Sequence, residues 1–139
     1  MPTQTGSIDL HIEDKVAYGR QSVRVWTGTI WPTSSQTGMT WTDDGKWVSV
    51  TAIFSGYSSG AQNYQWQAYT VPREYIRLHN GQGHTIFMGG ANFSPMGCKY
   101  IYFYLDHLAG ADYNDDTGTN NGITFRNNAY VIREIYLNY

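Results

Sequence analysis

Apolar side chains recur at every second position in several segments of this chain, and this period of two constrains the fold more than any other feature. The last such segment, residues 130–139, reads YVIREIYLNY. Alternate side chains of a strand point to opposite faces of its sheet. Because an open apolar edge invites aggregation, we expect this terminal strand to be paired inside a sheet.

The same period predicts further strands along the chain. They are residues 22–30, 64–71, 75–78, 85–88 and 99–105. Residues 39–54 are typical of a β-hairpin, because the dipeptide Asp44-Gly45 separates two alternating runs. In the second run the side chains expected to face the core are Val48, Val50, Ala52 and Phe54.

Short strands separated by turn residues favour an all-β fold, an antiparallel β-sandwich of jelly-roll-like form. No linker divides the chain, so residues 1–139 are predicted to form a single domain. Within it, residues 8–18 fit a helix or a strand, and residues 1–20 are a candidate N-terminal attachment segment.

The composition is rich in aromatic residues and poor in charge, with twelve Tyr, five Trp and five Phe but only 14% charged residues. The net charge is −2 and the nine Lys and Arg are scattered singly, so nucleic acid is not an expected partner. No apolar run is long enough to cross a bilayer, and the first residues lack signal-peptide features. We expect a product of the cytoplasm that is not inserted into a membrane.

A candidate binding surface lies in the strand at residues 99–105. Its alternation places Tyr100, Tyr102 and Tyr104 on one face, opposite the apolar side chains expected in the core. Tyrosine rings can stack on the C–H face of a sugar while their hydroxyls find polar partners. The alternative is that subunit or sheet packing covers the row. The polar side chains predicted to join it as ligand contacts are Asp106, His107, Asn114, Asp116 and Asn120.

Metal binding and catalysis find little support in the residue spacing. We expect no cofactor; the alternative is calcium held by Asp112, Asn114 and Asp116, although the glycine of that loop comes one place late. His79 and His84 lack a third zinc ligand and are interpreted as surface histidines. No spacing selects a carboxylate pair for glycoside hydrolysis, so we expect no catalytic residues. Cys98 is the one cysteine and is interpreted as a small buried side chain.

Residues 99–133 resemble the closing segment of minor structural and tail-tip proteins of phages that infect Gram-positive bacteria. In that family a tyrosine-rich strand, an Asp-containing turn, a Gly-Thr-x-Asn-Gly loop and an Asn-Asn-x-x-Val-x-Arg strand follow one another, as they do here in KYIYFYLDHLAG, GTNNG and NNAYVIR. Residues 4–10, QTGSIDL, are similar to the beginning of some phage tail proteins. Residues 105–108 depart from the family, where a second acidic residue followed by Arg is expected, so no role of that turn is carried over.

The resemblance implies a protein of a virion or tail-derived particle, made in the bacterial cytoplasm, that assembles as a homo-oligomer with a trimer favoured. The partners it implies are a cell-surface glycan and other virion or tail proteins. Our leading hypothesis is therefore a non-catalytic adhesion module that binds host-surface saccharide. The alternatives are a purely structural decoration or connector protein, a free lectin and, last, a glycoside hydrolase.

Overall fold

The structure is a computed structural model that describes residues 21–91 and 94–139. Residues 8–18 and the candidate attachment segment 1–20 lie outside this part of the chain. The predicted all-β fold is confirmed. The strands are β2 (Ser22–Ile30), β3 (Ser49–Gly56), β4 (Gln67–Pro72), β5 (Gln82–Gly89), β6 (Met96–Phe103), β7 (Leu108–Gly110), β8 (Thr117–Asn120), β9 (Ile123–Arg126) and β10 (Tyr130–Asn138). The helical elements are α3 (Arg73–Leu78) and the 3₁₀ turns η1 (Asp112–Asp115) and η2 (Asn127–Ala129).

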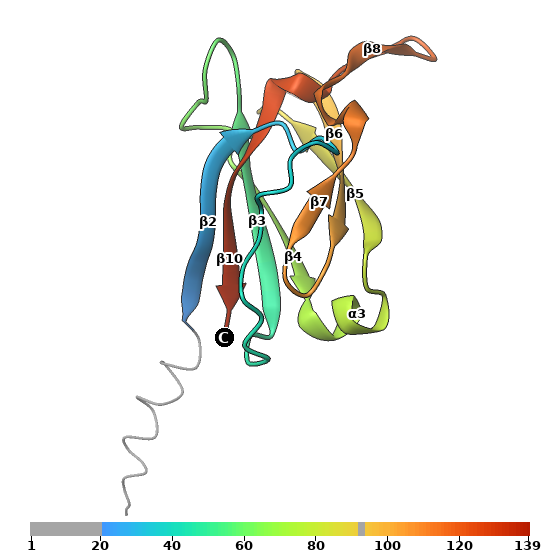
Figure 1. Cartoon of the computed structure of the whole chain (residues 1–139). Coiled ribbons are helices and arrows are strands. Elements are labelled where there is room, and N and C mark those ends of the chain that lie inside the picture. Colours follow the sequence, from blue (N-terminus) through green and yellow to red (C-terminus); the bar gives the residue numbers. More distant parts are fainter. Residues whose placement is uncertain (1–20, 92–93) are drawn as a thin grey trace, which may run out of the picture.

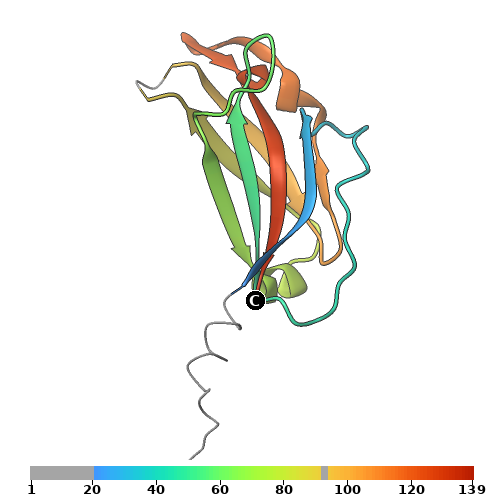
Figure 2. The ribbon, with the colours of Figure 1, turned by 90° about the vertical axis from the view of Figure 1, so that its left-hand side faces the viewer.

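Two antiparallel sheets form the body of the molecule (Figures 1 and 2). The larger has the order β2-β10-β3-β4, the smaller the order β5-β6-β7, and β8 and β9 form a separate hairpin. Strand β10 lies inside the larger sheet, paired with both β2 and β3, as predicted for the terminal strand. The arrangement is β-sandwich-like, and the jelly-roll detail stays a prediction.

One hydrophobic core receives side chains from both sheets. Val50, Ala52 and Phe54 of β3 are fully buried, as predicted. Strand β10 contributes Ile132 and Ile135, whose spacing of three would place them on opposite faces of a regular strand. A register shift just after Ile132 inserts one residue, as a β-bulge does, and returns Ile135 to the core face.

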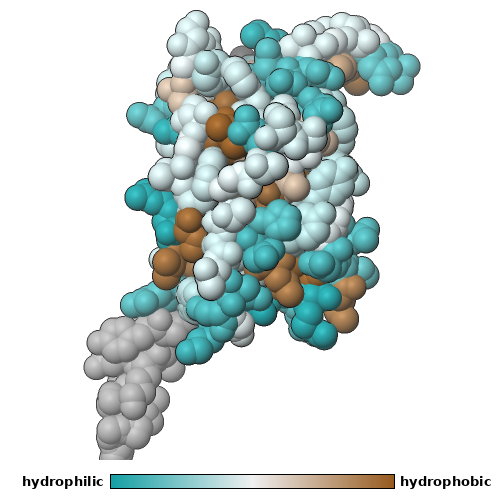
Figure 3. All heavy atoms as spheres, viewed as in Figure 1, coloured by the Kyte–Doolittle hydropathy of each residue, from teal (hydrophilic) through white to brown (hydrophobic). Residues whose placement is uncertain are grey.

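Surface hydropathy is mixed on the face seen in Figure 1. Figure 3 shows the apolar side chains of this face in small groups separated by polar ones. Among the described residues, no helix is long and apolar enough to cross a membrane.

The predicted strand at residues 75–78 is wrong, because these residues belong to helix α3, which connects the two sheets (Figure 1). Pro72 precedes the helix in an extended conformation, and an exposed pair between Glu74 and Arg77 spans one turn. Ile76 is its buried residue. Residues 75–78 contain one buried position, and so short a segment has no period that would distinguish a strand from a helical turn.

The predicted hairpin at residues 39–54 is also wrong in its first half. Gly45 has the positive φ of 75° that a tight turn requires, but the preceding residues do not pair with β3. Instead Met39 accepts a hydrogen bond from the amide of Leu108, so the segment follows the edge of β7. Val48, predicted to be buried, is 62% exposed because β3 begins one residue later, and Trp47 takes a buried position.

A buried polar network fastens η1 and η2 to β6. Lys99 is fully buried, and its Nζ donates to the carbonyl oxygen of Asn114 at 2.7 Å and to that of Asn127. Burial lowers the pKa of Lys99 to about 7. The Asn127 side chain accepts from the amide of Cys98 at 2.9 Å and donates to the carbonyl of Tyr113 at 2.8 Å. The network holds both turns behind the strand that carries the tyrosine row.

Candidate functional site

Tyr100 and Tyr102 lie on the outer face of the smaller sheet, where both are half-buried. Their rings meet edge to face, with centroids 5.2 Å apart. Gly83 of β5 makes room for this arrangement, because a Cβ there would lie about 2.2 Å from the Tyr100 ring. The missing side chain lets the ring lie down against the sheet.

Two further aromatic residues extend this surface. Tyr113 of η1 is 42% exposed, and its ring centroid lies 6.1 Å from that of Tyr100. Phe87 of β5 is 80% exposed and pairs in register with Cys98, which places it on the same outer face. We call Tyr100, Tyr102 and Tyr113 the tyrosine face, with Phe87 at its border.

The other predicted contacts at the turn after β6 lie together. Tyr104 is half-buried and stacks on the ring of His107, with centroids 4.0 Å apart and an interplanar angle of 10°. Asp106 is exposed, and its Oδ1 lies 2.7 Å from Nδ1 of His107. These three side chains form a compact polar and aromatic tip on this turn.

Asn114 is not available to a ligand, which corrects its prediction as a binding residue. It is fully buried, and its Oδ1 accepts from the Tyr100 amide at 2.7 Å. Its Nδ2 donates to the carbonyls of Pro32 and Tyr100 at 2.7 and 2.9 Å. This side chain is a structural clamp between the segment after β2, β6 and η1.

The same geometry gives the calcium alternative no support, and that alternative stays a prediction. Of its three candidate ligands, Asn114 faces inward, while Asp112 accepts a hydrogen bond from the Ser34 amide at 3.2 Å and another from the Ser34 hydroxyl. Within residues 21–91 and 94–139, no group of three or more His, Cys, Asp or Glu side chains is placed to hold a metal ion.

Asp116 and Asn120 are exposed, but the fold separates them from the Asp106 turn. Asp116 precedes β8, and Asn120 ends it at the tip of the β8–β9 hairpin. Figure 1 places this hairpin at the end of the molecule opposite α3, whereas Tyr104 packs against Gly81, close after α3. The predicted site residues therefore do not form a single site.

A second candidate site, which sequence reasoning missed, lies at the connection between β3 and β4. We call residues 57–66 the β3–β4 loop; it carries Tyr64 and Trp66, which are 58% and 47% exposed. Arg133 of β10 holds the loop: its Nη1 donates to the carbonyl of Gln62 at 2.9 Å, and its guanidinium lies 4.9 Å from the Trp66 ring centroid. The sequence feature that could have indicated this site is the presence of aromatic residues within a stretch rich in Ser, Gly and Gln.

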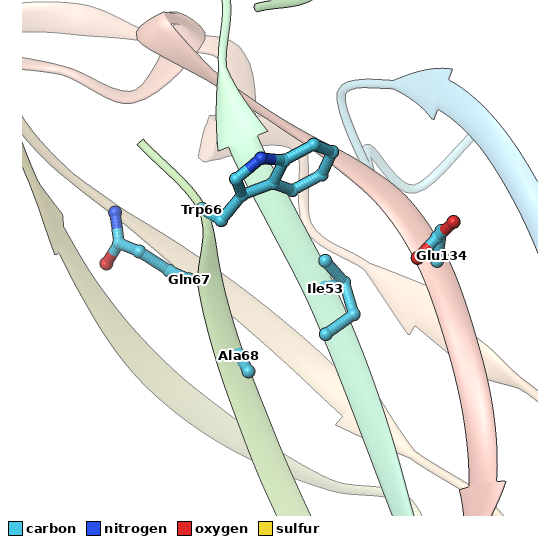
Figure 4. A pocket seen from close by; sticks show the side chains of 5 residues that line it. All are labelled: Ile53, Trp66, Gln67, Ala68 and Glu134. Carbon is cyan, nitrogen blue, oxygen red and sulfur yellow. The ribbon is translucent and has the colours of Figure 1, made fainter. Parts of the chain in front are cut away.

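Trp66 also borders a shallow groove of about 340 Å³ on the outer face of the larger sheet (Figure 4). In Figure 4 the indole extends from the start of β4 across β3, above Ile53. Glu134 of β10 forms the far wall. Its carboxylate accepts hydrogen bonds from Arg24 at 3.1 Å and from the Tyr136 hydroxyl at 2.9 Å.

The surroundings of four other titratable side chains follow from the fold. His79 is exposed, but His84 is half-buried, which corrects its prediction as a surface histidine: its Nδ1 lies 2.9 Å from the Tyr69 hydroxyl and burial lowers its pKa. Cys98 is a half-buried free thiol whose pKa is raised by burial. Asp43 binds Arg73 at 2.6 Å, and this hydrogen bond lowers the pKa of Asp43 to about 2.

Comparison with known proteins adds no assignment to this geometry. No protein-family model, no curated protein and no solved structure matches the chain.

Proposed function

We propose that this chain is a non-catalytic adhesion module of the phage-tail type that binds host-surface saccharide. The observation that carries the proposal is the tyrosine face, in which the Tyr100 ring of β6 lies 5.2 Å from the Tyr102 ring of the same strand and 6.1 Å from the Tyr113 ring of η1. Gly83 leaves room for the central ring to lie against the sheet, and a ring that already lies in the binding position loses less entropy when a ligand binds.

Such a surface suits a sugar because each ring offers an apolar body and a hydroxyl tip. Stacking on an open sheet face is weak at each site, and repetition of the face in a symmetric assembly strengthens it. From the resemblance of residues 99–133 to tail-tip proteins, we further propose that the module belongs to a virion or tail-derived particle, as a homo-oligomer with a trimer favoured, in contact with other tail proteins.

A glycan array with two matched variants tests the proposal. Tyr113→Ala removes a 42% exposed ring from the tyrosine face, and Tyr75→Ala removes a 41% exposed ring from α3. Loss of a stacked ring weakens binding by about fivefold, since aromatic contacts are worth about 1 kcal/mol beyond their area. We expect this loss for Tyr113→Ala alone. Equal binding by both variants, or no binding by the native chain, would refute the assignment.

Run with and without a chelator, the array also identifies the calcium-bridged form of the free-lectin alternative. A calcium-bridged lectin loses binding when a chelator is added. Adhesion through the tyrosine face persists under chelation, since it needs no metal.

A purely structural role is the second candidate, and Phe87 favours it. A phenylalanine that is 80% exposed on a sheet face is typical of a surface that another subunit covers. In that case Phe87→Ser lowers the oligomeric state measured by analytical ultracentrifugation, and no glycan binds. Glycan binding by a Phe87→Ser monomer would instead support adhesion through an open face.

A further inference from the structure

The β3–β4 loop is built as a preorganised element. Tyr57 and Ala61 form a β-bridge, and the Gln62 amide donates to the carbonyl of Gly56 at 2.9 Å. Ser59 and Gln65 hold positive φ angles of 57° and 58°, which non-glycine residues adopt at a cost of about 1 kcal/mol or more. The loop stays in this conformation because surrounding bonds fix it.

Arg133 supplies several of these bonds. Beyond its contact with Gln62, its Nη1 donates to the Ser55 hydroxyl at 2.8 Å and its Nη2 to Asn63 Oδ1 at 3.2 Å. The guanidinium also covers one side of the Trp66 indole. A single cation from β10 therefore fixes the loop at several points.

A polar hollow of about 240 Å³ lies where this loop meets the end of β9. It is lined by Tyr57, Ser58, Gln62, Tyr64, Gln65, Pro95, Arg126 and Ala129. The side-chain oxygens of Gln62 and Gln65 converge over Gly56, where a Cβ would lie about 2.2 Å from the first and about 2.6 Å from the second. Amide, hydroxyl and ring groups thus meet around one small space.

Charge distinguishes this hollow from the tyrosine face. None of its eight lining residues is acidic, and Arg126, the one Lys or Arg among them, is exposed. Within the described part of the chain, no carboxylate lies in salt-bridge range of Arg126. A planar guanidinium binds carboxylate and phosphate oxygens in a bidentate manner.

We propose that this hollow is a second binding site, which takes one negatively charged sugar residue. Arg126 binds the anionic group, the two glutamine amides bind hydroxyls, and the Tyr57 and Tyr64 rings border the sugar. The volume lies below the roughly 300–1,000 Å³ of sites for drug-sized ligands, which fits one sugar unit better than a chain. The site does not share residues with the tyrosine face, so neither assignment requires the other.

Titration calorimetry on the full chain tests the proposal with three probes: a hyaluronan tetrasaccharide for a sugar carboxylate, glucose 6-phosphate for a sugar phosphate, and chitotetraose as the neutral control. We expect one or both anionic probes to bind. Arg126→Gln weakens that binding by about tenfold or more, as expected for a lost charge-assisted hydrogen bond. Arg77→Gln on α3 removes the same charge from an exposed site at the far end and leaves binding unchanged.

The variants also keep the two sites distinguishable. Tyr64→Ala removes an exposed ring of the hollow and lowers affinity for the anionic probe, while Tyr113→Ala does not. The hollow is refuted if neither anionic probe binds the native chain, if Arg126→Gln and Arg77→Gln behave alike, or if chitotetraose binds the Tyr113→Ala variant as tightly as the anionic probes do. Chitotetraose binding that Tyr113→Ala removes belongs to the tyrosine face and leaves the hollow unaffected.

Discussion

The buried Lys99 makes the stability of this protein depend on pH in a direction opposite to that of a paired lysine. Its Nζ donates to two carbonyl oxygens, and burial lowers its pKa from the usual 10.5 to about 7. Between these values the unfolded chain binds more protons than the folded one, so the free energy of unfolding rises with pH. Below about pH 7 the lysine is charged in both states and its penalty is constant.

The magnitude follows from the two pKa values. From about pH 7 to about pH 9 the unfolded lysine stays protonated while the folded one loses its proton, which raises the free energy of unfolding by about 2 kcal/mol. Urea unfolding followed by tryptophan fluorescence measures this change. The titration should be done with Cys98→Ser present in every variant, because the raised pKa of that thiol acts in the opposite direction at higher pH.

Lys99→Met is the decisive variant. It fills a similar volume without a charge, and we expect it to remove the rise between about pH 7 and about pH 9. It also leaves the carbonyls of Asn114 and Asn127 without their donor, at about 1–3 kcal/mol each if no water replaces it. A native chain whose stability is flat or falls over this range, or an unchanged rise in Lys99→Met, would refute the reasoning.

Three further predictions concern single positions. Phe54→Ala lowers the free energy of unfolding by about 3–5 kcal/mol, whereas Val48→Ala changes it by less than about 0.5 kcal/mol; equal urea midpoints would contradict the exposure of Val48. Asp43→Asn weakens the bond to Arg73. Because the pKa of the Asp43 carboxylate is lowered in the folded state, the native chain loses stability as pH falls from about 4 towards 2, and the variant lacks this loss. Acid unfolding curves of the two proteins check this. Gly83→Ala displaces a ring of the tyrosine face and weakens glycan binding with little change in thermal unfolding, and retained binding would count against that face.

The all-β fold could be predicted because its longest strands alternate clearly. Residues 22–30 match β2 as predicted, and residues 130–139 match β10 to within one residue. The alternation within β3 also identified Val50, Ala52 and Phe54 as core. Where one face of a strand is apolar and the other polar, the local sequence is sufficient to predict the strand.

Long-range contacts explain what could not be predicted. The Asp44-Gly45 turn is real, but Met39 finds its partner at Leu108, nearly seventy residues away, and no local pattern encodes that choice. In the sequence, Asn114 is a polar residue in a loop rich in Asn and Asp, as a ligand-binding residue would be. Only its three hydrogen bonds to main-chain atoms show that its role is structural.

The β3–β4 loop was missed for a related reason. Arg133 interrupts the apolar run of β10, and this pattern indicates an ordinary surface arginine. Its partners lie 70 to 78 residues earlier in the chain, at Ser55, Gln62 and Asn63. The sequence therefore does not reveal that the arginine and the loop act together.

The position of β10 between β2 and β3 has a consequence for how the chain folds during synthesis. The two strands that flank β10 are not neighbours in the larger sheet, so they cannot form its middle by pairing with each other. At about 5–20 residues per second the ribosome makes β10 several seconds after β3. Until then one edge of β3 lacks its hydrogen-bonding partner, and the amide and carbonyl groups along that edge are open to pairing with another strand.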